Sequence, residues 1–367
     1  MWKVIILFGF SLLLSACRQE ACEKEHTDKI NVLVSDGCDG TALLGDVFET
    51  VETILLESST ESMITHIKRL IPFKEKYFIL DNKEQKCILV FDPKGKFIRK
   101  IGKVGHGRGE YITVEDFCID KENERIVILS NNSTVYAYKL DGEFLFKKEL
   151  DKSILWSIAS NSQGFLLSSN HLTYTSGENA FLFYRFDKDF NLIKKSHPVL
   201  PEQMYAVSGI SANPCTLKDK FVYTDLYRHK VFRFDQEGDI ESCYELQFSH
   251  QMPYIKFHDT NVFMKEQQKY DYLLDNILFD DKFIFFFVQK GKVHIAASDL
   301  SGKILQNKEF LGPIPKLLYS DEKHIFSAHS PEDIRWMAEA GLLSSKDIPS
   351  KTEDNYMIVK LKPICTK

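Results

Sequence analysis

The sequence predicts an all-β protein, a six-bladed β-propeller made of four-stranded antiparallel blades. Three observations lead to this fold: one phrase repeats along the chain, its copies consist of short apolar strands and turns, and their spacing is close to the ~40–50 residues of a propeller blade. A single repeat is too small to bury both its faces. Stacking the repeats in a closed ring supplies the core and limits exposed strand edges.

The repeated phrase is an apolar strand, an Asp, a short turn that often contains Gly, and a second apolar stretch. Its copies are LVFDPKGKFI, AYKLDGEFLF, YRFDKDFNLI, FRFDQEGDIE and AASDLSGKIL, around Asp92, Asp141, Asp187, Asp235 and Asp299. Successive copies lie 49, 46, 48 and 64 residues apart, and the strand YMIVKLK, 356–362, stands where a sixth would begin. Asp and Gly tolerate the backbone conformations of tight hairpins. The phrase therefore predicts six blades.

The runs between these turns favour strands over helices. Stretches such as KYFIL, ERIVIL, KFVYT and KFIFFFV are short and rich in β-branched and aromatic residues. Because a closed ring must join its ends, we expect the early strand VETILLES, 51–58, to pair within the blade that contains YMIVKLK. Two repeats are long, with the excess in 245–281 and in the segment from Ser330. There, Pro331-Glu332-Asp333 resembles a helix start and predicts a short helical insertion near the C-terminus.

The N-terminus carries an export signal. Lys3 precedes an apolar run over 4–14 that is too short to span a membrane, which predicts a signal peptide over 1–16. The run closes on Leu14-Ser15-Ala16-Cys17, which resembles the bacterial lipobox and implies that Cys17 is lipidated. A secretory peptide cut near Ala16, with Cys17 incidental, is the alternative. We expect a polar tether over 17–44 and the propeller over 45–367.

Acyl chains hold a protein on a membrane without a spanning helix. The expected location is therefore the cell envelope, at the outer membrane, facing the periplasm or the outside. The net charge is −5 and the Lys residues are dispersed, which argues against nucleic acid as a partner. Of eight cysteines, seven remain besides Cys17. We expect mostly free, buried thiols, with Cys22 and Cys38 as the one candidate pair.

The glycine-rich stretch GKVGHGRGEY, 102–111, has two interpretations. A phosphate-binding loop would open a helix, whose N-terminal amides hold the anion, but ITVEDFCID follows and predicts a strand. The glycines instead allow the chain to cross from one blade to the next through positive φ. A sharper hypothesis places four residues of this loop at the mouth of the central channel, in contact with a ligand: His106, Arg108, Glu110 and Tyr111.

Residues 77–111, YFILDNKEQKCILVFDPKGKFIRKIGKVGHGRGEY, resemble an NHL repeat, and FVYTDLYRHKVFRFD, 221–235, resembles its front half. With the lipobox, the chain resembles the six-bladed β-propeller lipoproteins of Bacteroidota-type bacteria, NHL-repeat-like or TolB-like propellers of which many have no assigned function. The resemblance covers about 45–367 and departs from the pattern at Arg108, where the family usually has Pro. It implies a propeller and a lipid anchor, and it implies no particular activity.

Asp and Asn side chains recur at comparable repeat positions and are candidate ligands of a calcium ion at the axis: Asp81, Asn82, Asn131, Asn132, Asn170 and Asp225. The alternative is that hairpin turns prefer these residues. The histidines lack zinc-site spacing, and no Gly-x-Ser-x-Gly occurs. We expect no cofactor, with calcium as the one candidate.

The expected function is that of a binding module for a protein, a peptide or an oligosaccharide. Aromatic residues in loops and insertions suit such ligands. One alternative is a metal-dependent hydrolase or lyase, lactonase-like, whose site on the axis would collect acidic or His side chains from three or more blades. Another is a structural component of an envelope complex, which would show an apolar patch on the insertions at 245–281 or 330–350.

Overall fold

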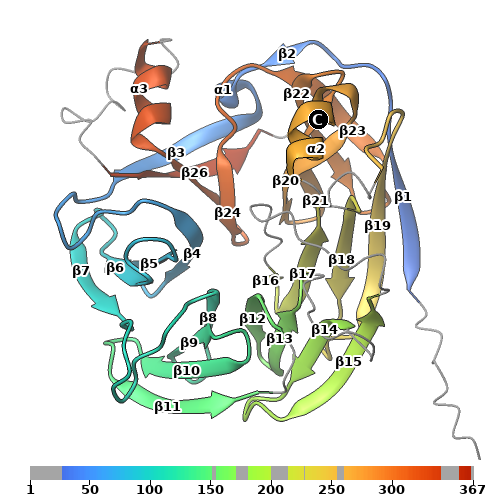
Figure 1. The fold of residues 1–367 in the computed structure, drawn as a ribbon. Coiled ribbons are helices and arrows are strands. Elements are labelled where there is room, and N and C mark those ends of the chain that lie inside the picture. Colours follow the sequence, from blue (N-terminus) through green and yellow to red (C-terminus); the bar gives the residue numbers. More distant parts are fainter. Residues whose placement is uncertain are drawn as a thin grey trace, which may run out of the picture.

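The computed structural model describes residues 27–150, 154–170, 181–199, 214–226, 228–253, 260–339 and 355–364. The expected signal peptide over 1–16 and Cys17 lie outside the described residues. The described chain forms a ring of six blades, each of four antiparallel strands, which Figure 1 shows along its axis. The predicted six-bladed β-propeller is confirmed.

The first three blades follow one another along the chain, each running from an innermost to an outermost strand. Blade 1 holds β4 (Ile67–Phe73), β5 (Lys76–Asp81), β6 (Cys87–Phe91) and β7 (Phe97–Ile101). Blade 2 holds β8 (Asp116–Asp120), β9 (Arg125–Ser130), β10 (Thr134–Lys139) and β11 (Phe144–Glu149). Blade 3 holds β12 (Ser157–Asn161), β13 (Gly164–Ser168), β14 (Phe181–Phe186) and β15 (Leu192–Pro198).

The last three blades take strands from the N-terminal part of the chain. Blade 4 holds β16 (Cys215–Leu217), β17 (Lys220–Asp225), β18 (Lys230–Phe234) and β19 (Ile240–Phe248). Blade 5 holds β20 (Tyr272–Phe279), β21 (Lys282–Gln289), β22 (Lys292–Asp299) and β23 (Ile304–Phe310). Blade 6 holds β24 (Lys316–Ser320), β25 (Ile325–His329), β26 (Met357–Pro363) and β3 (Phe48–Leu55).

Strand β3 closes the ring. It pairs antiparallel with β26, with Met357 opposite Leu55 and Lys362 opposite Glu49. The expected pairing of the early strand with YMIVKLK is therefore confirmed, although the strand begins at Phe48 rather than at Val51. Blade 6 thus joins residues that are some 300 positions apart in the chain.

We expected a polar tether over 17–44, but the second part of this segment contributes strands to the propeller. Strand β1 (Asp28–Val34) adds parallel to β19 as a fifth strand of blade 4, and β2 (Thr41–Ala42) adds to β23 of blade 5. The short helix α1 (Leu44–Val47) then leads into β3. An edge strand needs little apolar sequence, because it draws backbone hydrogen bonds from the open edge of β19. In β1, alternate residues such as Val32 and Val34 are buried, and this short alternation was missed.

The Asp turns join the third and fourth strands of each blade. The Asp92 carboxylate accepts the backbone N–H groups of Lys94 at 2.8 Å and Lys96 at 2.9 Å, and Gly95 takes the left-handed conformation with φ 81°. Asp187, Asp235 and Asp299 occupy the same place. In blade 2 the equivalent position belongs to Lys139, whose N–H bonds to Glu143, so Asp141 lies two residues further into the turn.

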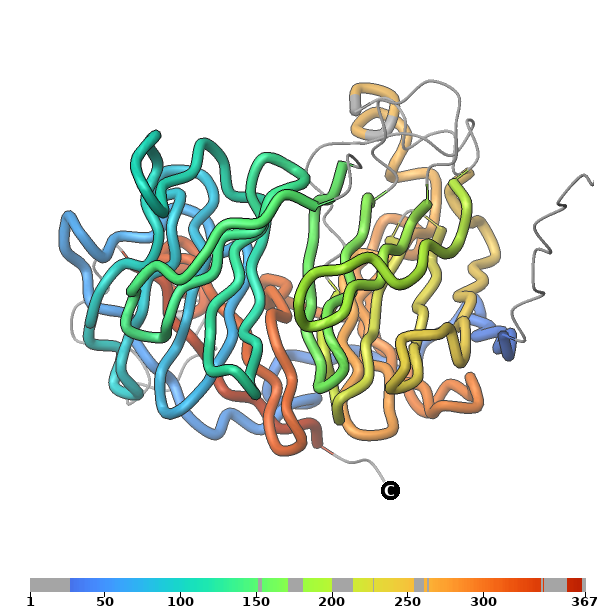
Figure 2. The backbone as a smooth tube through the Cα atoms, turned by 90° about the horizontal axis from the view of Figure 1, so that it is seen from below, coloured from blue at the N-terminus to red at the C-terminus, as the bar shows by residue number. Residues whose placement is uncertain are grey.

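Because strands alternate in direction, the second-to-third-strand turns and the connections between blades leave the ring on one side, here called the loop face. The third-to-fourth-strand turns mark the opposite face. Helix α2 (Thr260–Glu266) and the 3-10 helix η3 (Gln267–Lys269) lie in the connection from blade 4 to blade 5. In Figure 2 the light-orange part of this segment is at the upper edge, and the dark-red end of β26 is at the lower edge.

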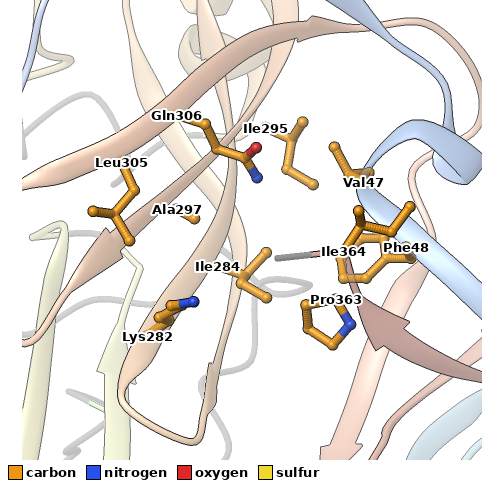
Figure 3. Close-up of a pocket in the computed structure, with 10 residues that line it drawn as sticks. All are labelled: Val47, Phe48, Lys282, Ile284, Ile295, Ala297, Leu305, Gln306, Pro363 and Ile364. Carbon is orange, nitrogen blue, oxygen red and sulfur yellow. The ribbon is translucent and has the colours of Figure 1, made fainter. Parts of the chain in front are cut away.

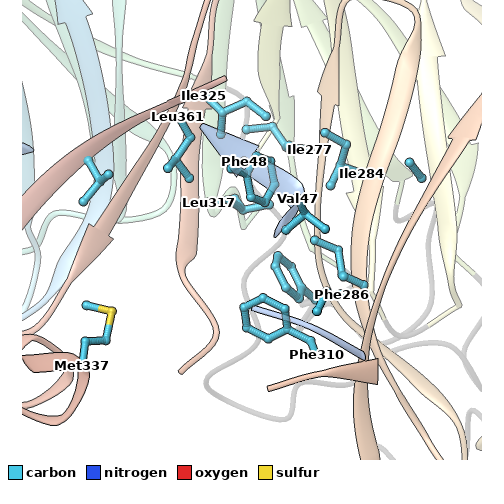
Figure 4. Packing of buried hydrophobic residues seen from close by; sticks show 14 of the residues in the cluster. Val47, Phe48, Ile277, Ile284, Phe286, Phe310, Leu317, Ile325, Met337 and Leu361 are labelled. Atoms are coloured by element: carbon cyan, nitrogen blue, oxygen red, sulfur yellow. The ribbon is translucent and has the colours of Figure 1, made fainter. Parts of the chain in front are cut away.

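The predicted C-terminal helix is present as α3 (Pro331–Glu339), between the second and third strands of blade 6. A reciprocal cap holds its start, because the Ser330 N–H donates to the Asp333 carboxylate at 2.9 Å and the Asp333 N–H donates to Ser330 Oγ at 3.1 Å. Ile334 and Met337 turn inward to the apolar layer between blades 5 and 6, which Figure 4 shows. Similar layers of buried apolar side chains fill the other spaces between blades.

Candidate functional site

The glycine-rich loop 102–111 is anchored by Tyr111, which is fully buried between blades 1 and 2. Its hydroxyl donates to the backbone oxygen of Lys86 at 2.8 Å, and its ring meets that of Tyr136 edge-on at 5.7 Å. Burial raises the pKa of Tyr111 well above its usual value. Tyr111 is therefore a packing residue of the blade interface.

The rest of this loop lies over the outside of blade 2. The guanidinium of Arg108 stands over the ring of Phe144, on the outermost strand β11, with 6.0 Å to the ring centre. Glu110 accepts the Gly107 N–H at 2.8 Å and pairs with Lys103 at 3.2 Å. The expected position of the loop residues at the channel mouth was thus wrong for Arg108 and Tyr111. His106 is exposed, and ligand binding by His106 and Glu110 stays a prediction.

The candidate calcium ligands occupy equivalent positions in different blades, since each lies at or just after the end of the blade's second strand, on the loop face. Their polar atoms serve the local turns. The Asp81 carboxylate accepts N–H groups of Thr65 at 2.8 Å and Lys83 at 2.9 Å, and the Asn82 amide oxygen lies 3.1 Å from His66 Nδ1.

The remaining candidates are turn residues too. Asn131 and Asn170 both adopt the left-handed conformation, with φ 49°. The Asp225 carboxylate accepts the Arg228 N–H at 3.2 Å. Within the described ranges, no three His, Cys, Asp or Glu side chains are grouped so that they could hold a metal ion. Turn chemistry accounts for these positions, and calcium binding stays a prediction.

The innermost strands β4, β8, β12, β16, β20 and β24 surround the axis, and their inner edges leave backbone groups without a strand partner (Figure 1). Side chains of neighbouring blades satisfy several of these groups. The Asp116 carboxylate accepts the Ile158 N–H at 2.9 Å, and the Asp275 carboxylate accepts the Leu317 N–H at 3.1 Å. The hydroxyls of Ser160 and Ser320 donate to backbone oxygens of the preceding blade at 2.7 Å. These bonds tie the blades together around the axis.

Arg69 crosses the axis. Its Nε and Nη2 atoms hold the Asp116 carboxylate of blade 2 at 2.6 and 2.5 Å, and its Nη1 donates to the backbone oxygen of Pro214 at 2.9 Å. Pro214 leads into β16 of blade 4, which stands opposite blade 1 in the ring. One guanidinium therefore links three blades.

Two further cations and a carboxylate complete an axial charge cluster, which comprises Lys68, Arg69, Asp116, Asp275 and Lys316. Burial lowers the pKa of Lys68 to about 8, against the favourable charge of Asp116. Loss of hydration raises the pKa of Asp275 to about 7 and lowers that of Lys316. Lys68, Arg69, Asp116 and Lys316 lie at or near the loop-face ends of their innermost strands, and Asp275 lies a few residues further along its strand. The cluster is therefore at the loop-face end of the channel.

The cluster was missed in the sequence, although a signal is present. Lys68 and Arg69 interrupt the apolar run IKRLIPF, and Asp275 interrupts YLLDNILF. A charged residue within the first apolar strand of a repeat is a better indicator of a side chain at the axis than the residues of the turns are. The cluster mixes cations and carboxylates, so the convergence of acidic or His side chains expected for a metal-dependent enzyme is not seen among the described residues.

A small crevice lies between blades 5 and 6, away from the axis (Figure 3). Its volume is about 30 Å³, and its walls are mostly apolar, with Phe48, Ile284 and Ile364 among them. A space of this size holds only one or two water molecules. We assign it no ligand.

The cysteines follow the expectation in part. Cys87, Cys118 and Cys243 are buried free thiols, as expected. Cys38 is an exposed free thiol, and its candidate partner Cys22 lies outside the described residues. Burial raises the pKa of Cys87 to about 12, which disfavours the thiolate and any nucleophilic role.

Two solved structures of Bacteroides proteins share this fold. The chain is similar to a Bacteroides fragilis NCTC 9343 protein named as a candidate exported protein, with 16% identity and a TM-score of 0.68 over 92% of this chain and 100% of that one. It is also similar to a DUF4221 family member from Bacteroides vulgatus ATCC 8482, with 9% identity and a TM-score of 0.59 over 86% and 98%. No curated protein matches the sequence.

No helix in the described ranges has the length and apolar character that crossing a membrane requires. The match to a family profile covers nearly the whole ring, from the added strand β1 to the end of β26. Over residues 28–362 the chain belongs to the DUF4934 family, a domain of unknown function.

Proposed function

We propose that this protein is a binding module of the bacterial cell envelope, held on the membrane by a lipid at Cys17, whose ligand is a protein, a peptide or an oligosaccharide. The observation that carries the proposal is the asymmetry of the ring. Both helical insertions leave the ring at the loop face, where the axial charge cluster also lies, while the opposite face carries tight Asp turns. A rigid ring with one elaborated face suits recognition.

The insertions also expose apolar side chains that a partner could cover. Met264 on α2 is 60% exposed and Trp336 on α3 is 46% exposed. Large apolar side chains at the surface of an insertion are typical of contact sites, because a flat ring offers contact area at low entropy cost. This observation favours a protein partner, and it keeps the second candidate function, a structural component of an envelope complex.

Site-specific photo-crosslinking tests the binding function. A benzophenone side chain is placed at Trp336 or Met264 on the loop face, and at Lys94 or Lys303 in turns of the opposite face as controls. The full-length, lipidated protein is irradiated in its own membrane. We expect adducts from the loop face only, and their mass and protease sensitivity separate protein from glycan ligands. Equal labelling from both faces, or none from the loop face, would refute the proposal.

The anchor has its own test. Cys17→Ser should move the protein from the membrane fraction to the soluble fraction, and the wild-type N-terminal peptide should carry the mass of acyl chains. A wild-type protein cut near Ala16 without added mass would instead support the secretory alternative.

A further inference from the structure

Exposed apolar side chains gather on the loop face where α3 meets the connection from blade 5 to blade 6. The Trp336 ring lies next to this connection, because a Cβ at Gly312 would be 3.9 Å from its Cζ3 atom. Trp336 is 46% exposed, and Leu311 and Ile314, on either side of Gly312 in the chain, are 44% and 36% exposed.

Strand β2 brings one more apolar residue to this place. The Leu311 N–H donates to the Ala42 oxygen at 2.8 Å, and Leu43, which is 37% exposed, follows Ala42. One layer of buried side chains supports the exposed ones. Ala42, Phe310 and Met337 belong to a single apolar cluster, and each is next in the chain to one of the exposed residues. We call the exposed set the loop-face patch, which comprises Leu43, Leu311, Ile314 and Trp336.

Helix α3 has its inward contacts without Trp336. Ile334 and Met337 are 1% and 4% exposed and join the apolar layer between blades 5 and 6. Trp336 stands on another side of the helix, where most of one side of its ring can be covered only from outside. Adjacent large apolar side chains that remain at the surface are typical of an interaction site.

Acidic side chains of α3 border the patch. Glu332 and Glu339 lie one turn before and one turn after Trp336 on the helix surface, and both are exposed. Their carboxylates make no hydrogen bond or ion pair with another described residue. Arg335 is the basic residue of this helix, so α3 presents more negative than positive charge beside the patch.

The other charges near the patch add to this excess. The Asp46 carboxylate accepts the Leu43 N–H at 2.8 Å, and Asp333 caps α3 at Ser330. Lys316 follows the connection, but its ammonium group donates to a backbone oxygen of blade 1 at the axis. Four carboxylates and one guanidinium therefore surround the patch, a net charge of −3.

Two occupants fit this surface badly. A second copy of the chain, docked patch to patch, would bring two acidic borders together, and four apolar residues are few beside the roughly 20–30 residues that each side of a stable interface contributes. A sugar ring would stack on Trp336 alone and leave Leu311 and Ile314 uncovered.

We infer that the loop-face patch binds a protein segment that carries both apolar side chains and Lys or Arg residues. The apolar side chains cover Leu311, Ile314 and Trp336, and the cations meet Glu332 and Glu339. Complementary charge of this kind favours the right partner and speeds its arrival. The inference rests on the proposed binding function and adds the chemistry of the partner.

Calorimetry at low ionic strength tests this inference. It uses the chain from Arg18 onward, which contains every described strand and needs no detergent. The basic apolar probe is the peptide acetyl-KLLKLLK-amide. Its counterparts are ELLELLE with the charge reversed, KSSKSSK without apolar side chains, and maltotetraose as a glycan.

We expect the basic apolar probe to bind at least about tenfold more tightly than each counterpart, because one buried apolar side chain contributes about 1.4 kcal/mol or more. Equal or tighter binding of the acidic peptide, the polar peptide or the sugar would overturn the inference. So would a failure of the basic apolar probe to bind.

Variants assign the contact. Trp336→Ala should weaken binding of the basic apolar probe at least about tenfold, and Glu332→Gln/Glu339→Gln should weaken it about three- to tenfold and reduce its dependence on salt. Ile193→Ala, at a 59% exposed position on β15, and Glu237→Gln, in a turn of the opposite face, are the matched controls and should change nothing. Wild-type affinity in Trp336→Ala would contradict the inference.

A second measurement needs no variant. Trp156 and Trp336 are the two tryptophans of the chain from Arg18 onward. Covering Trp336 should shift the emission to shorter wavelength as the basic apolar probe saturates, and an unchanged spectrum would count against the patch. Loop-face crosslinks from Met264 or Trp336 without any preference for this probe would leave the binding function standing and remove only the chemistry of the partner.

Discussion

Replacing Asp116 with Asn should destabilise the propeller by about 3–5 kcal/mol, because it removes one partner of a buried ion pair. The side chains of Arg69 and Asp116 are only 7% and 0% exposed, and two contacts of 2.6 and 2.5 Å join them. Water cannot replace the lost carboxylate. The guanidinium would keep its charge at the axis, close to the cation of Lys68.

The magnitude follows from the contacts. Asn has the shape of Asp and its oxygen can still accept the Ile158 N–H, so the substitution chiefly removes the charge. Each hydrogen bond to a charged group contributes about 1.5–3 kcal/mol, and Arg69 makes two to this carboxylate. Their sum is of the same order as the measured cost of breaking buried pairs, about 3–5 kcal/mol.

Urea unfolding followed by tryptophan fluorescence measures the change. Asp239→Asn is the matched control, because it makes the same substitution in the exposed pair with Lys194, which has 54% and 40% exposed side chains 2.7 Å apart. That control should lose at most about 1 kcal/mol. The double variant Arg69→Met/Asp116→Asn should recover part of the loss, because the guanidinium charge is removed and the new amide oxygen can still accept the Ile158 N–H.

The reasoning fails if Asp116→Asn loses no more stability than Asp239→Asn. It also fails if the double variant is less stable than the single one. Either result would mean that the axial ion pair is hydrated or does not tie the blades together.

The remaining predictions concern pH and packing. The pKa of Asp275 is raised from 3.8 to about 7, so between these pH values the folded state binds more protons than the unfolded state. The free energy of unfolding should therefore fall as pH rises through this window. Asp275→Asn should lose that dependence in urea unfolding at pH 4.5 and 7.5. His329 is 1% exposed, and burial lowers its pKa from 6.5 to about 4. The free energy of unfolding should therefore fall by up to about 3 kcal/mol as pH drops through this range. His329→Leu should show a weaker dependence of stability on pH, and an unchanged dependence would contradict the assignment. Gly109→Ala should cost about 1–3 kcal/mol, because φ is +76° and a Cβ would stand 2.7 Å from Phe144; wild-type thermal stability would disprove the clash. Tyr111→Phe should cost about 1 kcal/mol in urea unfolding by removing the bond to Lys86, and no loss would show that the bond is dispensable.

The number of blades could be read from the sequence because its causes are local. An Asp that accepts backbone N–H groups and a residue in the left-handed conformation form the same turn at Asp92, Asp235 and Asp299, and the strands on either side follow from their apolar runs. The closing strand could be inferred because a ring leaves one free position for it. The helix at Pro331 has its cap within four residues.

The tertiary structure determined which side chains meet at the axis of the propeller. Arg69 and Pro214 are 145 residues apart, and no local pattern brings them together. The bulge that adds Lys68 depends on how β4 and β5 register, and the charges of Asp275 and Lys316 have meaning only once blades 5 and 6 are neighbours. The glycine-rich loop shows the converse, since its composition is easily recognised in the sequence while its position over Phe144 is set by packing. Turns depend on adjacent residues, but the axial site depends on long-range contacts that only the closed ring creates.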